Sequence, residues 1–409
     1  MKYVLIIGDG MADDPLNALS GLTPLEKAAK PTIDDLAKNG LIGTVQNIPG
    51  GYPPGSDTAI MSIFGCSPAK YYSGRAPLEA AAQGIALKAG DAAFRCNNIA
   101  LSDADNFEDR LILSHSAGGI GGEDGKALVE YLFSHPEFKA LADKAGMSIN
   151  PTESYRHIAV QSSVDIKGLR LMPPHDHLRE TVRDTKPVGC ANADVLCEML
   201  EKANEVLEQH PINIERRAQG KLPANGIWFW AEGTAALLPH FAEQFGHDGA
   251  VVSAVPLCHG IARLTGLDVI TVQGATGELD TNFEGKVEAG LKALDKYDFV
   301  AVHLEAPDEC THNGDLPGKL QAIEWLDSRI VAPMIEGLRK RGEDFRVLIL
   351  SDHKTLMEKN GAHGADPVPF MIYDSRETIR SGMEYSEKNG LKGVMLSAGT
   401  ELMPMLFEL

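Results

Sequence analysis

Three short runs of almost uninterrupted apolar residues stand out along the chain, at residues 2–8, 299–304 and 345–350. Runs of this length without polar alternation are typical of strands buried on both faces of a parallel sheet. A fourth run, at residues 368–373, is a further strand candidate.

Helical patterns lie between these runs. Residues 32–39 predict a short helix with Thr32 as its N-cap and Gly40 just past its end. From residue 319 to 341 apolar residues recur at helical spacing, and we expect Pro333 to kink that helix. Strands that alternate with helices predict an α/β fold with a mainly parallel sheet.

The middle of the chain has a different character. Between about residues 90 and 265 it is rich in Pro, His, Arg and Gly, and it contains no repeat or low-complexity linker. We therefore expect a discontinuous core built from residues 1–90 and 266–409, with residues 91–265 inserted as a second domain.

Composition narrows the range of partners. The 409 residues include 38 Lys and Arg against 57 Asp and Glu, a net charge of −19. Such a charge argues against nucleic acid or an anionic membrane as the main partner, but it allows a small anionic substrate in a locally basic pocket. No apolar run approaches the roughly 18 residues that span a bilayer, and the N-terminus has no signal-peptide pattern. Together with six scattered cysteines that form no CxxC pair, this predicts a cytoplasmic protein with reduced thiols.

Each of the three apolar runs is followed closely by a carboxylate. Asp9 follows the first, Asp308 lies four residues after the second, and Asp352 lies two residues after the third. Because ligand sites of open α/β sheets lie beyond the carboxyl ends of the strands, we expect these acids to converge.

Histidines accompany these acids. Asp308 and His312 are four residues apart, which places both on one face of a helical turn, and His353 directly follows Asp352. His363 lies between two glycines that allow a close backbone approach. Such a pair alone is more often surface or capping chemistry, but three acids and three imidazoles form an oxygen and nitrogen set that suits two Mn²⁺ or Zn²⁺ ions.

Ser56 is a candidate nucleophile. It follows a Pro/Gly turn and precedes an apolar helical stretch, so it lies at a helix N-terminus. The simplest interpretation is an N-cap serine. The alternative is a hydroxyl activated by free backbone N–H groups and a divalent cation for phosphoryl transfer.

An anionic substrate also needs cations, and arginine forks match phosphate and carboxylate groups. Arg75 is one candidate, although Glu79 four residues on suggests a structural ion pair instead. The other candidates lie in the inserted segment, and they are Arg156 and His157, residues 179–183, and Arg216 with Lys221.

The chain resembles the archaeal type of cofactor-independent phosphoglycerate mutases, within the alkaline phosphatase superfamily. The resemblance runs nearly end to end, and its motifs lie at residues 8–13, 23–28, 55–59, 74–81, 305–312, 351–353 and His363. It implies an alkaline-phosphatase-like core and an inserted α/β cap that binds substrate and excludes water.

The resemblance also implies roles for individual residues. Asp308, His312 and His363 would hold one metal ion, and the other would be held by Asp9, Ser56, Asp352 and His353. Mn²⁺ is the usual metal of these mutases, with Zn²⁺ or Mg²⁺ as alternatives. Ser56 would carry phosphate as phosphoserine while 3-phosphoglycerate and 2-phosphoglycerate interconvert.

The chain departs from the family at several places that hold no metal ligand. Residues 230–233 are Trp-Ala-Glu-Gly where we expect Trp-Gly-Gln-Gly, and residues 255–260 and 351–356 also differ. Residues 224–230 resemble a bacterial subgroup for which homoserine kinase activity has been proposed. The alternatives are therefore transfer of phosphate to another acceptor or to water, and a metal-binding protein without catalysis.

Overall fold

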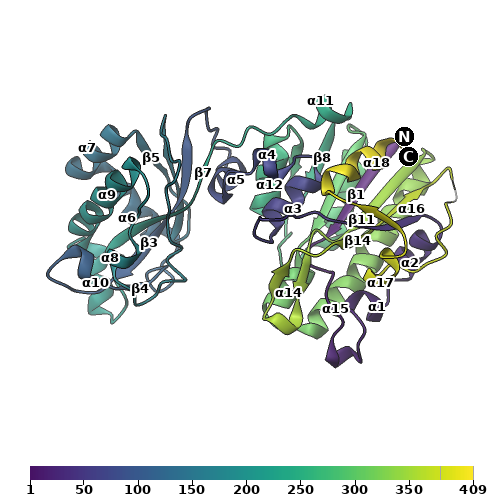
Figure 1. Cartoon of the computed structure of the whole chain (residues 1–409), viewed down its shortest axis with the longest axis horizontal. Helices are drawn as coiled ribbons and strands as arrows, with labels where there is room; N and C mark the ends of the chain where they lie inside the picture. Colours follow the sequence, from purple (N-terminus) through teal and green to yellow (C-terminus); the bar gives the residue numbers. More distant parts are fainter. Residues whose placement is uncertain (378, 409) are drawn as a thin grey trace. The chain divides into compact units, whose positions relative to one another are not determined.

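A computed structural model describes residues 1–377 and 379–408. The chain forms two compact units, one from residues 1–72 together with residues from 238 onward, and the other from residues 73–237. We call them unit 1 and unit 2, and the chain passes between them twice (Figure 1).

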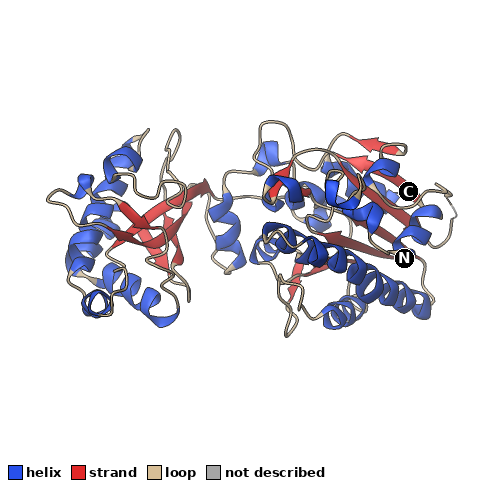
Figure 2. Cartoon of the chain, turned by 90° about the horizontal axis from the view of Figure 1, so that it is seen from below, coloured by secondary structure: helices blue, strands red, loops and turns tan. Residues whose placement is uncertain are grey.

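Unit 1 is an α/β unit built around an eight-stranded sheet with the order β15-β2-β14-β11-β1-β10-β8-β9. Five of its seven strand pairings are parallel, and helices cover both faces of the sheet (Figure 2). Its strands are β1 (Lys2–Gly8), β2 (Leu41–Val45), β8 (Gly249–Val252), β9 (Asp268–Ile270), β10 (Phe299–Leu304), β11 (Phe345–Leu350), β14 (Val368–Asp374) and β15 (Val394–Leu396), and a separate hairpin pairs β12 (Lys354–Leu356) with β13 (Ala362–Gly364).

The helices of unit 1 include two that carry residues of the site described below, α3 (Ser56–Ile63) and α14 (Ala306–His312). The others are α1 (Pro24–Lys27), α2 (Pro31–Lys38), α4 (Pro68–Tyr71), α11 (Phe241–Phe245), α12 (Pro256–Leu264), α13 (Phe283–Ala293), α15 (Leu316–Trp325), α16 (Ala332–Arg341), α17 (Glu387–Gly390) and α18 (Leu402–Glu408).

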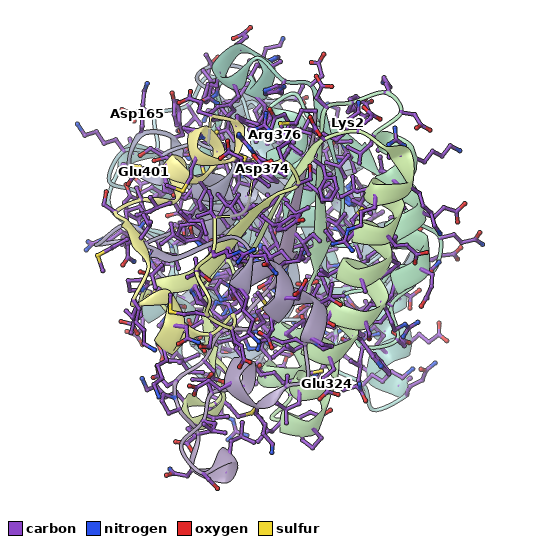
Figure 3. The ribbon with its side chains drawn as sticks, turned by 90° about the vertical axis from the view of Figure 1, so that its right-hand side faces the viewer. Lys2, Asp165, Glu324, Asp374, Arg376 and Glu401 are labelled. Carbon is purple, nitrogen blue, oxygen red and sulfur yellow. The ribbon has the colours of Figure 1, made fainter. Side chains whose placement is uncertain are left out.

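The three apolar runs form the centre of the sheet, as predicted. They are β1, β10 and β11, and their side chains are almost entirely buried. The fourth run is β14, which pairs antiparallel to β11. The connection from β11 to β14 carries a hairpin instead of the helical crossover that a parallel neighbour requires. At its end, Asp374 accepts hydrogen bonds from Arg346 and Arg376. Figure 3 labels Asp374 and Arg376, which lie next to each other.

Two helix predictions need correction. The helix expected at residues 32–39 is α2, which begins at Pro31, so Thr32 lies inside the helix and Lys30 is the N-cap residue. Proline favours this first helical position because it has no N–H group to lose. The helix expected to kink at Pro333 contains a π-helical segment, Leu326–Val331, between α15 and α16.

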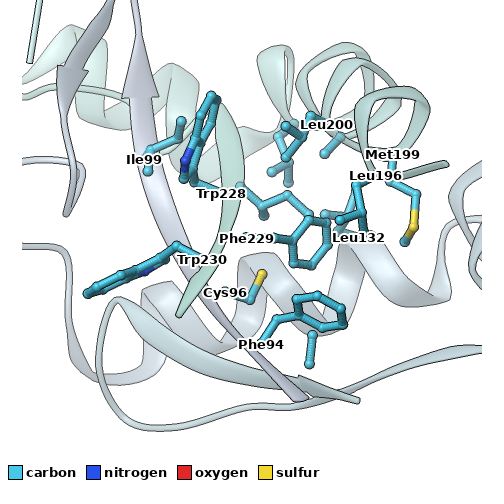
Figure 4. Close-up of a cluster of buried hydrophobic side chains, with 14 of the residues drawn as sticks. Phe94, Cys96, Ile99, Leu132, Leu196, Met199, Leu200, Trp228, Phe229 and Trp230 are labelled. Carbon is cyan, nitrogen blue, oxygen red and sulfur yellow. The ribbon is translucent and has the colours of Figure 1, made fainter. Parts of the chain in front are cut away.

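Unit 2 is built on one sheet with helices packed against it. Its strands are β3 (Ala92–Leu101), β4 (Ile112–Ser114), β5 (Met147–Asn150), β6 (Arg156–Gln161) and β7 (Gly226–Thr234), in the order β4-β3-β6-β5 with β7 also paired to β3. Its helices are α5 (Arg75–Ala82), α6 (Gly122–Ser134), α7 (Pro136–Ala145), α8 (Val182–Thr185), α9 (Ala191–Glu208) and α10 (Pro211–Ala218). Side chains of β3, β7, α6 and α9 form the core shown in Figure 4.

Unit 2 begins and ends earlier in the chain than the expected insertion of residues 91–265. Helix α5 packs against β3 and β7, so it belongs to unit 2. Strand β8 pairs with β10 in the large sheet, so the segment from residue 249 to 264 belongs to unit 1.

Candidate metal centre

The carboxyl ends of three neighbouring strands lie level at one edge of the large sheet. Gly8 of β1 pairs with Leu304 of β10, and Ile7 pairs with Leu350 of β11. The segments that leave these ends carry Asp9, the helix α14, and Asp352 with His353. The expected convergence of the three acids therefore follows from strand register.

Asp9, Asp352 and His353 form a cluster that we call the buried group, because each side chain is at most 1% exposed. His353 Nε2 lies 3.5 Å from Asp9 Oδ1 and 3.3 Å from Asp352 Oδ2. Neither of these two carboxylate oxygens has a hydrogen-bond partner among the described residues. Buried oxygens without partners are costly, and a cation between them removes the cost.

The pKa shifts of the buried group also favour a bound cation. Burial raises the pKa of Asp9 well above its ordinary value, and the neighbouring carboxylates of Asp352 and Asp308 raise it further. Burial also lowers the pKa of His353, which favours the neutral imidazole that binds metals. A divalent cation reverses this repulsion by pairing with the ionised carboxylates.

One residue of this site, His303, was not predicted from the sequence. It lies in β10, its Nε2 is 2.9 Å from Asp9 Oδ2, and its Nδ1 is 3.1 Å from Ser253 Oγ. His303 thus occupies one oxygen of Asp9 and leaves Oδ1 for an ion. A histidine within an otherwise apolar strand was the available sequence signal.

The second cluster, which we call the open group, consists of Asp308, His312 and His363. His312 Nε2 lies 3.0 Å from Asp308 Oδ2 and 3.0 Å from His363 Nε2, and His363 Nε2 lies 3.5 Å from Asp308 Oδ1. Burial opposes ionisation of Asp308, but hydrogen bonds from His312 and His363 lower its pKa far below its ordinary value.

The open group depends on two local features. Asp308 and His312 are one helical turn apart on α14, as predicted, and His363 reaches them from the hairpin strand β13. Gly361 has φ +73°, and a Cβ there would lie 2.9 Å from the Cα of His312. A side chain at position 361 would therefore push the hairpin away from α14.

Both groups fit divalent cations. Donors about 2.1 Å from one ion in a tetrahedral arrangement lie about 3.4 Å from one another. The distances of 3.0–3.5 Å within each group agree with that spacing. Carboxylates mixed with imidazoles are typical ligands of Mn²⁺ and Zn²⁺.

Ser56 lies beside the buried group. It is the first residue of α3, the N-cap residue is Gly55, and no side-chain capping bond is formed. The Ser56 hydroxyl lies 3.1 Å from His353 Nε2 and 3.5 Å from Asp9 Oδ2. The N-cap interpretation is therefore wrong, because the hydroxyl faces the acids and not the helix.

In unit 2, Arg75 and Arg156 lie near a cluster of charged and aromatic side chains. Glu79 accepts hydrogen bonds from Arg75 and, more closely, from Arg95, as the ion-pair alternative anticipated. The guanidinium groups of Arg95 and Arg156 stack on the Trp230 ring at 4.6 and 5.5 Å. Arg156 Nε is buried and has no hydrogen-bond partner among the described residues.

His157 does not fit the substrate-binding role that we predicted for it. Its side chain is fully buried, its Nδ1 accepts a hydrogen bond from the Thr152 N–H, and its Nε2 lies 3.1 Å from the Asn98 amide. Burial lowers the pKa of His157 to about 4. These contacts make it part of the core of unit 2.

Arg216 and Lys221 lie together in unit 2. They line a cavity of about 310 Å³ with the glycine-rich segment 118–121. The Arg216 guanidinium already donates hydrogen bonds to the carbonyl oxygens of Ala117 and Leu222. Among residues 179–183, Arg183 forms surface ion pairs with Glu108 and Asp109.

Fold and site together define an α/β protein with two candidate divalent-cation groups next to a serine hydroxyl. A family model described as 2,3-bisphosphoglycerate-independent phosphoglycerate mutase matches residues 37–213. A protein of that name from Methanosarcina acetivorans is 43% identical over 399 residues, which cover 97% of each chain. The chain belongs to the family of 2,3-bisphosphoglycerate-independent phosphoglycerate mutases.

Solved structures agree with this assignment. A protein of Pyrococcus horikoshii superposes with a TM-score of 0.79 at 31% identity, covering 99% of this chain and 96% of the other. The cofactor-independent phosphoglycerate mutase from Thermoplasma acidophilum superposes with a TM-score of 0.67 at 26% identity, covering all of both chains. Within residues 1–377 and 379–408, no helix is both long and apolar enough to cross a membrane.

Proposed function

We propose that this protein interconverts 3-phosphoglycerate and 2-phosphoglycerate through a phosphoserine at Ser56. The observation that carries the proposal is the position of the Ser56 hydroxyl, 3.1 Å from His353 Nε2 at the edge of the buried group. The names of the relatives support the same substrate pair.

The reaction consists of two balanced transfers. Ser56 Oγ attacks the phosphorus of 3-phosphoglycerate, the bond from phosphorus to the 3-oxygen breaks, and that oxygen gains the proton lost by Ser56. The 2-hydroxyl of the retained glycerate then attacks phosphoserine, the bond from phosphorus to Oγ breaks, and Ser56 regains a proton. Water must be excluded between the two steps, because hydrolysis of phosphoserine would make the enzyme a phosphatase.

Two divalent cations are part of the proposal, and Mn²⁺ is the expected metal, with Zn²⁺ or Mg²⁺ as alternatives. The open group would hold one ion, and the buried group with Ser56 would hold the other. Such ions lower the pKa of a bound hydroxyl and neutralise charge on the phosphoryl oxygens.

Substrate binding is assigned to unit 2, acting as a cap. Arg156 is the strongest candidate, because its buried Nε has no partner among the described residues. Arg75 is the second candidate, because it donates a hydrogen bond to Glu79, whose pKa Arg156 also lowers. Guanidinium groups suit the carboxylate and phosphate of phosphoglycerate.

The six cysteines are unpaired, which agrees with the cytoplasmic location expected for the enzyme.

The test is formation of 2-phosphoglycerate from 3-phosphoglycerate with Mn²⁺, followed by coupled enolase absorbance. Ser56→Ala should abolish turnover, because the acceptor oxygen is lost. Ser62→Ala is the matched control, since Ser62 is a buried serine on the same helix α3. Turnover that survives in Ser56→Ala would exclude the phosphoserine route. An inactive wild-type protein with both metals bound would exclude the mutase and leave transfer to homoserine or water.

A further inference from the structure

A single hydroxyl lies between the two ligand groups. Thr355, in the hairpin strand β12, is fully buried. Its Oγ1 lies 2.6 Å from Asp308 Oδ1 of the open group and 3.1 Å from His353 Nδ1 of the buried group. Nothing in the sequence pattern distinguished this threonine from other buried threonines.

The directions of these hydrogen bonds are determined by the partners. A carboxylate that binds a metal ion is ionised and can only accept hydrogen bonds, and Asp308 Oδ1 lies 2.6 Å from the Thr355 hydroxyl. The Thr355 hydroxyl therefore donates to Asp308 and accepts from His353 Nδ1–H. The carbonyl oxygen of Lys354, 3.2 Å from Nδ1, requires the same proton position. His353 Nε2 then keeps its lone pair on the side that faces Asp9, Asp352 and Ser56, where an ion would be held.

Thr355 is itself held firmly. Its N–H donates to Ala12 O, and its carbonyl oxygen accepts a hydrogen bond of 2.8 Å from Lys319 Nζ. Lys319 is fully buried and forms an ion pair of 2.9 Å with Asp13. A Cβ at Gly10 would collide with Thr355 Oγ1, so only glycine at that position lets the loop after β1 pack against the hydroxyl.

We propose that Thr355 is a positioning residue that couples the two metal-ion sites through the chain His353 Nδ1–H to Thr355 Oγ1–H to Asp308 Oδ1. Filling either group orients a ligand of the other, and such coupling is reciprocal. Substitution of a residue that hydrogen bonds to a metal ligand typically lowers the affinity for the metal by about 10–100-fold. The inference rests on the metal-ligand sets of the proposed function, and it assigns Thr355 no contact with substrate.

The test is Mn²⁺ binding by chelator-stripped full-length protein, with free Mn²⁺ measured by electron paramagnetic resonance. The wild type should bind two ions in coupled steps. Thr355→Val keeps the shape and loses the hydroxyl, so we expect weaker binding by about 10–100-fold and a change of about tenfold in the ratio of the two stepwise constants. Thr355→Ser should restore both quantities.

Thr265→Val is the matched control, because Thr265 is a buried threonine of unit 1 whose hydroxyl donates only to backbone carbonyls of α12. It should bind Mn²⁺ as the wild type does. Wild-type constants in Thr355→Val would overturn the proposal. If that variant does not fold, independent filling of the two sites in the wild-type isotherm would overturn it as well.

The Mn²⁺ titration contains no phosphoglycerate, so it is separate from the test of the proposed function. A protein that binds two coupled ions but forms no 2-phosphoglycerate would refute the mutase and leave the role of Thr355 standing. A mutase whose two ions bind independently would refute only the role of Thr355.

Discussion

The two ligand groups of unit 1 contain similar side chains in opposite surroundings. The buried group has two carboxylates and one imidazole, and each side chain is at most 1% exposed. The open group has one carboxylate and two imidazoles, and His312 is 38% exposed. Asp308 is already hydrogen bonded to both of its histidines, whereas Asp9 and Asp352 each keep an oxygen without a partner among the described residues.

This difference means that the two groups affect the stability of the metal-free protein differently. Without an ion, burial and then the repulsion from neighbouring carboxylates raise the pKa of Asp9, so the buried group destabilises the metal-free protein. The open group satisfies itself and can exchange its ion with solvent. Stability and function are therefore opposed in the buried group and nearly independent in the open group.

The largest expected effect comes from Asp352→Asn. Asparagine can still accept the hydrogen bonds that Asp352 Oδ1 accepts from the N–H groups of Gly10 and His353, but it removes one of the two buried charges. We expect turnover to fall by more than the 10–100-fold typical of residues behind ligands. The metal-free protein should become more stable, because the substitution removes one of the carboxylates whose repulsion, together with burial, raises the pKa of Asp9. Enolase-coupled kinetics and urea unfolding measure the two quantities.

Asp327→Asn is the matched control for this substitution. Asp327 is also buried, and it accepts hydrogen bonds from the N–H groups of Thr32 and Ile33 at the start of α2. This variant should keep wild-type turnover and Mn²⁺ binding. A metal-free Asp352→Asn protein that is less stable than the wild type would contradict the repulsion argued for the buried group.

The next effect comes from His312→Gln, which breaks the open group. Because His312 is partly exposed, we expect the unfolding free energy of the metal-free protein to change by no more than about 0.5 kcal/mol. Bound Mn²⁺ should fall from two ions per chain to one, measured by elemental analysis after dialysis, with a large loss of turnover. His177→Gln, at a partly exposed histidine beside Glu180, is the control. Two tightly bound ions in His312→Gln would show that the ligand set is wrong.

The effect expected to be smallest on turnover concerns stability alone, and it compares the two groups with a histidine that faces no ion. His157 has a pKa of about 4 in the folded protein, below the ordinary value of 6.5. Above pH 6.5 it is neutral in both states, and between pH 6.5 and 4 only the unfolded chain binds the proton. Unit 2 should therefore lose up to about 3 kcal/mol of stability as the pH falls through this window.

Tryptophan fluorescence can follow this loss, because Trp228 and Trp230 both lie in unit 2. His157→Asn retains an acceptor for the Thr152 N–H and removes the titrating ring, so its unfolding should depend less on pH. An unchanged pH dependence in that variant would assign the effect to other groups.

Much of the core and of the site was predictable from the sequence. Buried parallel strands need continuous apolar residues, so β1, β10 and β11 were visible, and their carboxyl ends indicated where Asp9, Asp308 and Asp352 converge. Helical spacing alone paired Asp308 with His312. Ser56 and His363 were candidates from the turns in which they lie, and the resemblance to the family then implied their roles.

The cations of unit 2 were less predictable. The sequence does not distinguish Arg156, His157 and Arg216, because all three are polar residues of the same inserted segment. In the structure the Arg156 guanidinium has a buried nitrogen without a partner among the described residues, His157 is a core residue, and Arg216 holds a loop. Side-chain direction and burial depend on contacts with distant segments, which local patterns do not contain.

The sequence by itself determined the strands, the acids that follow them and the family, because these depend on local composition and spacing. Tertiary structure alone decided that Ser56 faces His353 instead of capping its helix, that His303 occupies one oxygen of Asp9, and that Thr355 lies between the two groups. Those contacts join residues up to 297 positions apart, and only the packing of the whole sheet brings such residues within hydrogen-bond distance.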